Sequence, residues 1–274
     1  MSNYNSKADF YDDYRQYCPG LKECLEHLEI NSNTSILDVG CGSGVFMKEL
    51  IKFKPNILHG LEPSENMLKK AKKLLDIEIY NNEIDIKLFQ GYIQDIPEKK
   101  YDIIICFQVI QNLTQNYDES YEERIFFFKN IKRILKDNGK LILTTRNIQE
   151  NSDYSDMYWY ADPNIMPKTI EAMNKLIPKN IQNELELCDF KNIKTSISSD
   201  KIYKEKYYLC PELVETTSWR AADSLWHQCE TNGELDFFIN FIKNLIKNNL
   251  IEKYLNERDI LRKEGHIVIV SCNI

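Results

Sequence analysis

Ile36-Leu37-Asp38-Val39-Gly40-Cys41-Gly42-Ser43-Gly44 is a short apolar strand that ends in glycines, and residues 45–53 continue it with the pattern of a helix. Glycine permits tight backbone angles and lets the chain approach a ligand closely. The N-terminus of the helix that follows offers free N–H groups and positive potential to a carboxylate or a phosphate. The stretch therefore predicts a strand, a ligand-binding turn and a helix in immediate succession.

Strands and helices alternate around this turn as far as residue 145. The apolar runs that we interpret as strands cover residues 35–39, 57–61, 85–89, 102–107 and 140–145. A helix capped by Ser64 follows the second run, and an amphipathic helix over 122–136, ended by Asn138-Gly139, precedes the fifth. Such alternation predicts a doubly wound, mostly parallel sheet of the α/β class.

The second half of the chain and its N-terminus are less regular. We expect helices over residues 8–29 (interrupted near Cys18-Pro19-Gly20), 169–176, 212–229 and 234–254, and strands over 192–198 and 266–272. The expected fold is a single Rossmann-like domain, 1–274, with about seven strands and an antiparallel last strand. Residues 1–30 would form a helical lid, 31–150 the cofactor-binding core, and 151–274 the rest of the sheet with a helical insertion that caps the substrate.

The spacing of the glycines distinguishes between cofactors. A dinucleotide-binding turn has the form G-x-G-x-x-G/A, but here Val45 occupies the third small-residue position. The stretch instead resembles motif I of class I S-adenosylmethionine-dependent methyltransferases, whose usual form is close to L-D-x-G-C-G-x-G. The resemblance implies S-adenosylmethionine as the cofactor, and it assigns five residues of the turn to its binding: Asp38, Gly40, Cys41, Gly42 and Gly44.

An acidic residue ends the second predicted strand. Glu62 follows Gly44 by 18 positions, and a carboxylate there can accept hydrogen bonds from both hydroxyls of a ribose. Dinucleotide-binding enzymes use such an acid too, so Glu62 alone does not distinguish the two classes of cofactor. Together with the glycine turn it indicates a cofactor-binding site. The resemblance adds the nearby Pro63 and Met67 to the cofactor site.

The loop after the third predicted strand holds the adenine in the resembled family. Many members have an aspartate directly after the glycine of this loop, where this chain has Tyr92, and a subgroup has a glutamate two positions later, where it has Gln94. We therefore expect Tyr92, Ile93 and Gln94 to form the adenine wall. Asp95 is the alternative acceptor for the adenine amino group.

Two further segments indicate a branch of the family. The (N/D)-P-P-(Y/F) tetrapeptide of DNA and glutamine N-methyltransferases is absent after the fourth predicted strand, and so is the paired-glutamate loop of arginine methyltransferases. Residues 14–19, Tyr-Arg-Gln-Tyr-Cys-Pro, resemble an element that precedes motif I in small-molecule enzymes similar to trans-aconitate methyltransferase. Those relatives often carry glutamine and then His-Trp after the fourth strand. This chain keeps Gln108 but has Gln111-Asn112 in the His-Trp position.

This resemblance implies roles at the reacting end of the cofactor. Arg15 would pair with the carboxylate of the methionine part, and Tyr14 or Tyr11 would face the sulfonium. Gln108 joins the cofactor-binding set. The candidate catalytic residues are Tyr14, Gln111, Asn112 and His227, the last because it is near Trp219, Arg220 and Trp226 in the predicted insertion.

Aromatic residues follow the fifth predicted strand. Arg146 and Asn147 come directly after it, and Tyr158 and Trp159 lie a few positions later. We expect these four residues to bind the substrate beneath an aromatic lid. The alternative is an aromatic loop that packs onto the insertion helices.

Bulk composition limits the partners. The chain has 274 residues, a net charge of −7 and a pI near 5.3, whereas nucleic-acid binding usually needs a basic face, so nucleic acid is not expected as a partner. Its eight cysteines form no C-x-x-C pair and its four histidines are dispersed, so we expect no metal and reduced thiols in a cytoplasmic protein. The longest apolar run is far too short to span a membrane, and the oligomeric state is left open.

We interpret the sequence as a methyltransferase that acts on an oxygen or nitrogen atom of a small molecule, with secondary metabolism as one setting. An alternative of the same fold is a cyclase or lyase in which the cofactor's own amine or carboxylate expels methylthioadenosine. A third is a silent cofactor-binding module that acts through a partner.

Overall fold

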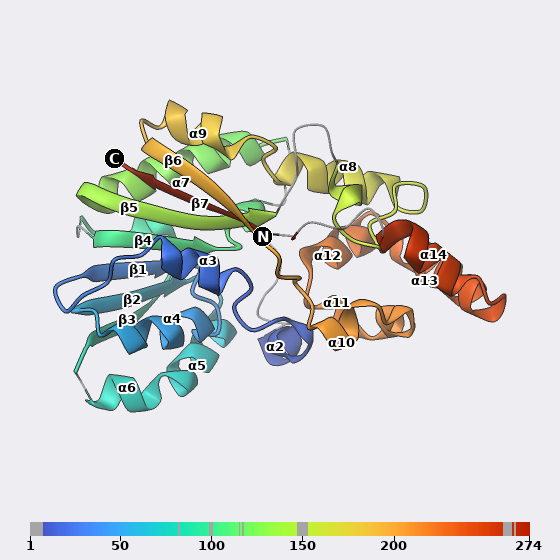
Figure 1. The fold of residues 1–274 in the computed structure, drawn as a ribbon, viewed down its shortest axis with the longest axis horizontal. Helices are drawn as coiled ribbons and strands as arrows, with labels where there is room; N and C mark the ends of the chain where they lie inside the picture. Colours follow the sequence, from blue (N-terminus) through green and yellow to red (C-terminus); the bar gives the residue numbers. More distant parts are fainter. Residues whose placement is uncertain are drawn as a thin grey trace.

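A mixed, seven-stranded sheet forms the centre of the computed structural model, which describes residues 8–81, 83–98, 101–114, 116, 118–146, 153–259, 265 and 267–274 (Figure 1). The strand order is β3-β2-β1-β4-β5-β7-β6, and β7 is antiparallel to both of its neighbours while the other pairs are parallel. The strands are β1 (Ser35–Val39), β2 (Ile57–Glu62), β3 (Asp85–Gln90), β4 (Tyr101–Phe107), β5 (Leu135–Arg146), β6 (Lys191–Ser198) and β7 (Ile267–Asn273). The predicted α/β doubly wound fold with an antiparallel last strand is confirmed.

Helices cover both faces of the sheet. In β4, Ile103 and Ile105 pack on the face covered by α3, α4 and α5, while Ile104 packs on the face covered by α7 and α9. This two-sided burial explains why β4 is apolar without interruption. The covering helices are α3 (Leu21–Glu26), α4 (Val45–Leu50), α5 (Glu65–Leu74), α6 (Asp76–Asn81), α7 (Ser120–Ile134) and α9 (Ile181–Leu187).

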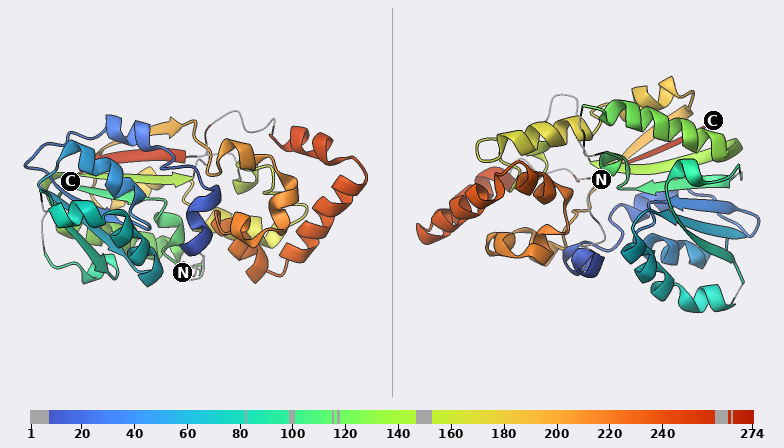
Figure 2. Two further views of the ribbon diagram at one scale, coloured as in Figure 1. Left: turned by 90° about the horizontal axis from the view of Figure 1, so that it is seen from below. Right: turned by 180° about the vertical axis from the view of Figure 1, so that it is seen from behind.

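The remaining helices gather beside the sheet and form a cap (Figure 2). They are α2 (Tyr11–Tyr14), α8 (Pro167–Leu176), α10 (Glu205–Tyr208), α11 (Thr217–Arg220), α12 (Ser224–Thr231), α13 (Leu235–Lys247) and α14 (Ile251–Asp259). Short 3-10 turns complete the chain at Ala8–Phe10, Ile51–Phe53, Ile93–Asp95, Ile110–Asn112, Tyr154–Asp156 and Pro211–Glu215. Trp219 of α11 belongs to the same apolar cluster as Ile142 of β5, so the cap and the sheet share one core.

Several predicted helices have different bounds. Residues 212–229 are not one helix, because Asp223 starts a new one by accepting a hydrogen bond from the Leu225 nitrogen. Residues 234–254 are two helices, because Asn249 has φ +56° and breaks the first. The N-terminal segment was predicted over 8–29, and the interruption around Pro19 is confirmed, but α2 and α3 are short.

The helix predicted to end at Asn138-Gly139 also differs. It was expected to run to residue 136 but ends at Ile134, two positions earlier, because Leu135 already pairs with Tyr101 of β4. Asn138 and Gly139 therefore lie within β5. The Ser64 cap of α5 is confirmed, since its hydroxyl accepts a hydrogen bond from the Met67 nitrogen at 3.3 Å.

Three further features bear on the class of protein. All eight cysteines lie in the described part of the chain and none is paired in a disulfide. Within that part, no three histidine, cysteine, aspartate or glutamate side chains are grouped as a metal site would need. None of the described helices has the length and apolar character that crossing a membrane requires.

Candidate cofactor and acceptor site

A pocket of about 960 Å³ opens at the carboxyl ends of β1, β2 and β4. This is where the strand order of the sheet reverses, which is the usual ligand site in open α/β sheets. Nine of the predicted cofactor residues line it: Gly40, Gly42, Glu62, Pro63, Met67, Tyr92, Ile93, Gln94 and Gln108. Its wall is completed by Val39, Leu61, Ser64, Gly91, Phe107, Val109, Asn112, Leu113, Thr114, Glu123, Phe126 and Phe127.

The glycine turn is shaped by close packing. Gly40 has φ +72°, its nitrogen donates to the Leu61 carbonyl at 2.7 Å, and a Cβ at this position would lie 2.6 Å from a methyl group of Val109. Gly44 has φ +81°, and a Cβ there would lie 3.1 Å from the Cβ of Ala71. Any larger residue at Gly40 would push the loop after β4 out of the pocket wall. Cys41 and Gly44 shape the turn without lining the pocket.

Glu62 is held in a fixed orientation at the end of β2. One of its carboxylate oxygens accepts from the Gly42 nitrogen at 3.1 Å, and the other accepts from the Ser64 nitrogen at 2.9 Å. Burial raises the pKa of Glu62, against the effect of these two hydrogen bonds. Each oxygen keeps further acceptor capacity, because an ionised carboxylate offers about four lone-pair positions. The arrangement fits a pair of vicinal hydroxyls, as in a ribose.

Asp38 is a buried acid outside the pocket lining, and it forms no ion pair with any residue that the structure describes. It is 1% exposed, and neither of its oxygens has a hydrogen-bond partner among the described residues. Burial, and secondly the charge of Glu62, raises the pKa of Asp38 to about 8. A buried carboxylate of this kind is costly unless a donor or cation reaches it. Asp38 therefore fits a ligand that carries an ammonium group close to a ribose, as S-adenosylmethionine does.

The predicted adenine wall lies on one side of the pocket. Tyr92, Ile93 and Gln94 all line it, on the 3-10 turn after β3. Asp95, the alternative acceptor, takes a hydrogen bond from the Tyr92 nitrogen at 2.8 Å. Because that bond shapes the turn, the structure favours a positioning role for Asp95.

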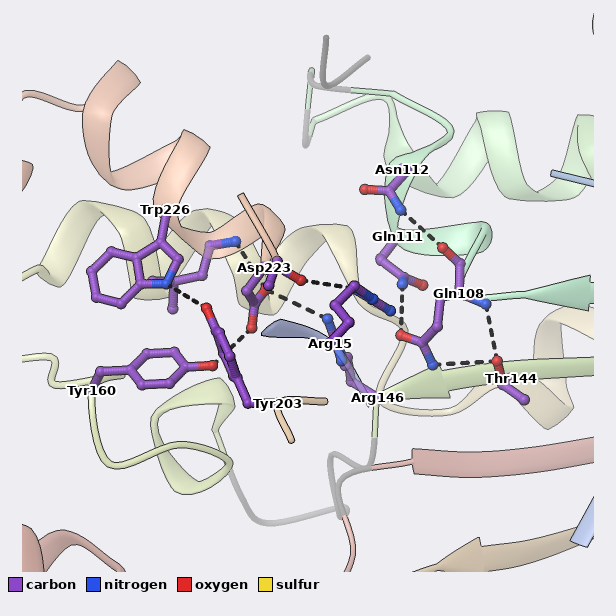
Figure 3. A network of polar contacts seen from close by, with 12 residues as sticks. Arg15, Gln108, Gln111, Asn112, Thr144, Arg146, Tyr160, Tyr203, Asp223 and Trp226 are labelled. Atoms are coloured by element: carbon purple, nitrogen blue, oxygen red, sulfur yellow. Dashed lines mark hydrogen bonds and ion pairs between the residues drawn. The ribbon is translucent and has the colours of Figure 1, made fainter. Parts of the chain in front are cut away.

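Gln108 organises the opposite side of the pocket (Figure 3). It has φ +55°, and both its backbone and its side-chain nitrogen donate to the hydroxyl of Thr144, at 2.9 and 3.2 Å. Gln111 donates to the Gln108 side-chain oxygen at 3.0 Å, and Asn112 donates to its backbone carbonyl at 2.9 Å. The residues in the His-Trp position therefore form an amide network that contains no base.

The N-terminal residues lie outside the pocket lining. Arg15 donates to the Ala222 carbonyl at 2.7 Å, and the Tyr14 ring contacts Tyr207 edge-on at 4.9 Å. The Tyr11 side chain lies outside the described residues. The predicted contact of these residues with the methionine part of the cofactor stays a prediction.

The predicted substrate residues do not form one site: Arg146 and Tyr158 contact each other, whereas Trp159 is part of the cap. Arg146 and Tyr158 are buried together, with the guanidinium carbon 5.7 Å from the centre of the ring. Trp159 is equally buried but donates to the Tyr208 carbonyl at 2.7 Å, which is a structural role in the cap. His227 is half-buried on α12 and does not line the pocket. Asn147 lies outside the described residues.

Sequence reasoning missed two parts of the site. Glu123, Phe126 and Phe127 of α7 line the pocket, although the helix carried no signal besides an apolar stripe that reads as core. Asp223, which is 3.4 Å from the Arg146 guanidinium, was also missed, because nothing in the sequence relates α12 to the end of β5.

Comparisons with known proteins agree on the class. A family model described as "Methyltransferase domain" matches residues 30–209. A tRNA U34 carboxymethyltransferase of Nautilia profundicola is 27% identical over 201 residues, which are 70% of this chain and 57% of that protein. The chain spans about half the length of the curated relatives it matches.

Two solved structures share the fold. A candidate methyltransferase from an antibiotic biosynthesis pathway of Anabaena variabilis has a TM-score of 0.64 and 18% identity, over 91% of this chain and 95% of that one. Phosphoethanolamine N-methyltransferase 2 of Haemonchus contortus, solved with phosphomonomethylethanolamine and S-adenosylhomocysteine, has a TM-score of 0.59 and 16% identity, over 99% and 58%. At such identities the likeness establishes a common fold.

Proposed function

The chain belongs to the methyltransferase-domain family, which makes S-adenosylmethionine its cofactor and methyl transfer its class of reaction, and from this premise we propose that it methylates a small molecule at an oxygen or nitrogen atom. When bound, the cofactor supplies an electrophilic methyl group on sulfur, which a lone pair of the acceptor displaces in line. The protein's part is to hold both partners and to exclude water.

The described residues fit this cofactor at both of its polar ends. Glu62 would hold the ribose hydroxyls, since it lines the pocket and its two oxygens are already oriented by Gly42 and Ser64. Asp38 would accept the ammonium group, which would satisfy the carboxylate that is otherwise buried without a partner. Tyr92, Ile93 and Gln94 would contact the adenine.

We take the acceptor end of the site to be the amide network around Gln108 together with the Arg146–Asp223 pair, and its burial is the observation that favours a small molecule. Gln111, Arg146 and Asp223 are 4%, 2% and 1% exposed. A polymer such as RNA could not reach these groups without displacing the cap, and the net charge of −7 gives no general attraction for phosphates. A relative that acts on tRNA makes RNA the competing acceptor, so the experiment below includes it.

The chemistry of the acceptor end narrows the reaction. Gln108, Gln111 and Asn112 are amides, so they can orient an acceptor but cannot remove its proton at neutral pH. Carboxylates and neutral amines attack without prior deprotonation, whereas alcohols need a base. The network therefore favours an acidic or amine acceptor.

A direct test incubates the protein with S-adenosylmethionine and, separately, small acids, amines, phenols and bulk tRNA. S-adenosylhomocysteine formed with a small acceptor, and absent in the Asp38→Asn/Glu62→Gln double variant, would support the proposal. If S-adenosylhomocysteine formed only with tRNA, the acceptor would be RNA and the proposal of a small molecule would be wrong. Methylthioadenosine released without any acceptor would point to the cyclase or lyase alternative, which the relatives do not favour.

A further inference from the structure

Arg146, the last residue of β5, is a buried cation with unused donors. It is 2% exposed, and the only hydrogen bond of its guanidinium to a described residue joins Nη2 to Asp223 at 3.4 Å. Nε and Nη1 have no hydrogen-bond partner among the described residues. A buried guanidinium with unsatisfied N–H groups carries a large desolvation cost, which no acceptor among the described residues offsets.

Asp223 is not that acceptor. Its carboxylate caps α12 by accepting from the Leu225 nitrogen at 3.1 Å, and it accepts from the Tyr160 hydroxyl at 2.9 Å. The contact with Arg146, at 3.4 Å, is the longest of the three. The Asp223 carboxylate is thus bound by two other donors of the cap, and Arg146 keeps donors for a further partner (Figure 3).

A second unused donor lies in the same cluster. The hydroxyl of Tyr154 is fully buried and has no hydrogen-bond partner among the described residues. Its ring lies 5.6 Å from the ring of Tyr158, which in turn lies 5.7 Å from the Arg146 guanidinium. Arg146 and Tyr154 both contact Tyr158, and both have donors that lack an acceptor among the described residues, which suits an anion with two oxygens.

The position of Arg146 relates this cluster to the methyl-transfer pocket. Thr144 precedes Arg146 by two positions on β5, so both side chains project from the same face of the strand, about 7 Å apart along it. Thr144 holds Gln108, which lines the cofactor pocket. Arg146 does not line that pocket itself, but a group bound by it lies near the residue that holds Gln108 in the pocket wall.

We infer that Arg146 and Tyr154 form the subsite for a carboxylate of the acceptor, which makes the acceptor a small carboxylic acid; this rests on the proposed function, because the cofactor pocket supplies the methyl group. Arg146 is already paired with Asp223 at 3.4 Å, so a carboxylate adds one net negative charge to the pair. A phosphate dianion would add two negative charges beside the carboxylate of Asp223 and is disfavoured.

The test measures binding rather than turnover. The protein, saturated with S-adenosylhomocysteine, is titrated by calorimetry with benzoate, 3-phenylpropionate and succinate, each against its amide, and with inorganic phosphate. We expect at least one carboxylate to bind at least tenfold more tightly than its amide. Equal affinity for acids and amides, no binding of any acid below 10 mM, or preference for phosphate would overturn the inference.

Variants assign the effect to the subsite. Arg146→Gln is expected to weaken carboxylate binding roughly thirtyfold or more, and Tyr154→Phe several-fold, because each removes a donor to a buried charge. Arg146→Lys keeps the charge, so its loss of carboxylate affinity is expected to lie between those of Arg146→Gln and Tyr154→Phe. This variant preserves the test if Arg146→Gln does not fold. Arg220→Gln is the matched control, because Arg220 lies in the same cap with its donors on the Val214 carbonyl and the Thr217 hydroxyl.

The affinity for S-adenosylhomocysteine separates the two proposals. It is expected to stay within threefold of the original protein in all four variants. Cofactor binding without carboxylate binding would overturn the subsite alone. Absence of cofactor binding in the unaltered protein would overturn the proposed function.

Discussion

The carboxylate of Glu62 accepts a hydrogen bond from the Gly42 nitrogen at 3.1 Å, which joins the end of β2 to the glycine turn that follows β1. Two separate sequence signals, the turn and the acid, are thereby one structural unit. A ligand that binds Glu62 also contacts the turn. This coupling makes the site sensitive to any change that rotates the carboxylate.

Replacing either buried acid should therefore weaken cofactor binding. We expect Glu62→Ala and Asp38→Ala each to lower the affinity for S-adenosylhomocysteine by about tenfold or more, as loss of a buried charged acceptor does. Calorimetry measures this, with the largely exposed Glu65→Ala as a control that should bind normally. Unchanged affinity in both buried variants would contradict the cofactor assignment.

The raised pKa of Asp38 predicts how binding depends on pH. Because this pKa is about 8 in the free protein, Asp38 is mostly protonated at neutral pH, and pairing with an ammonium group requires its ionised form. Affinity should rise with pH between 6 and 8, by up to about tenfold per pH unit. Calorimetry in buffers of different ionisation enthalpy should also detect a released proton. Asp38→Asn removes the dependence if Asp38 is its source.

The same pKa predicts the stability of the ligand-free protein. A carboxyl whose folded-state pKa lies above its unfolded value of 3.8 destabilises the fold increasingly as pH rises from about 4 to 8, since the unfolded chain releases its proton first. Asp38→Asn should remove this loss. Its free energy of unfolding should exceed that of the original protein at pH 8 and approach it at pH 4. Urea unfolding at the two pH values measures the difference, and a gain at pH 4 as large as at pH 8 would contradict the assignment.

Two glycines with the same backbone angle allow the cost of a left-handed backbone to be measured apart from the cost of a steric clash. Gly40 and Gly233 both have φ +72°, but a Cβ at Gly40 would meet Val109 at 2.6 Å, whereas one at Gly233 would meet nothing within 4 Å. Gly233→Ala should cost about 1 kcal/mol from the left-handed backbone alone and leave cofactor binding unchanged. Gly40→Ala should cost more and lower the affinity at least tenfold. Equal behaviour of the two variants in thermal unfolding and calorimetry would rule out the crowding argument.

The sequence predicts the positions of the strands and many residues of the pocket lining because both depend on local signals. The strands follow from apolar runs such as that of β4, and the turn follows from glycines such as Gly40, where the packing of Val109 leaves no room for a Cβ. The acceptor end depends on contacts between distant segments. Arg146 and Asp223 meet across 77 positions, and no periodic pattern marks such a pair.

Helix bounds in the cap were wrong for a related reason. Apolar periodicity continues through Asp223 and Asn249, so residues 212–229 and 234–254 read as long helices. The breaks come from a side-chain cap in one case and a left-handed residue in the other, and apolar periodicity records neither of them.

Adjacent threonines of β5 provide the last prediction. The Thr144 hydroxyl accepts from the backbone and the side chain of Gln108, whereas the Thr145 hydroxyl is buried without a partner in the described part of the chain. Valine has nearly the same shape, so Thr144→Val should cost about 1–3 kcal/mol by leaving the Gln108 nitrogen unsatisfied. Thr145→Val should be neutral or stabilising, because it removes a desolvated hydroxyl. Urea unfolding measures both. Weaker S-adenosylhomocysteine binding is expected in Thr144→Val alone, since only Thr144 positions a residue of the pocket wall; similar losses in the two variants would mean that Gln108 is held by other contacts.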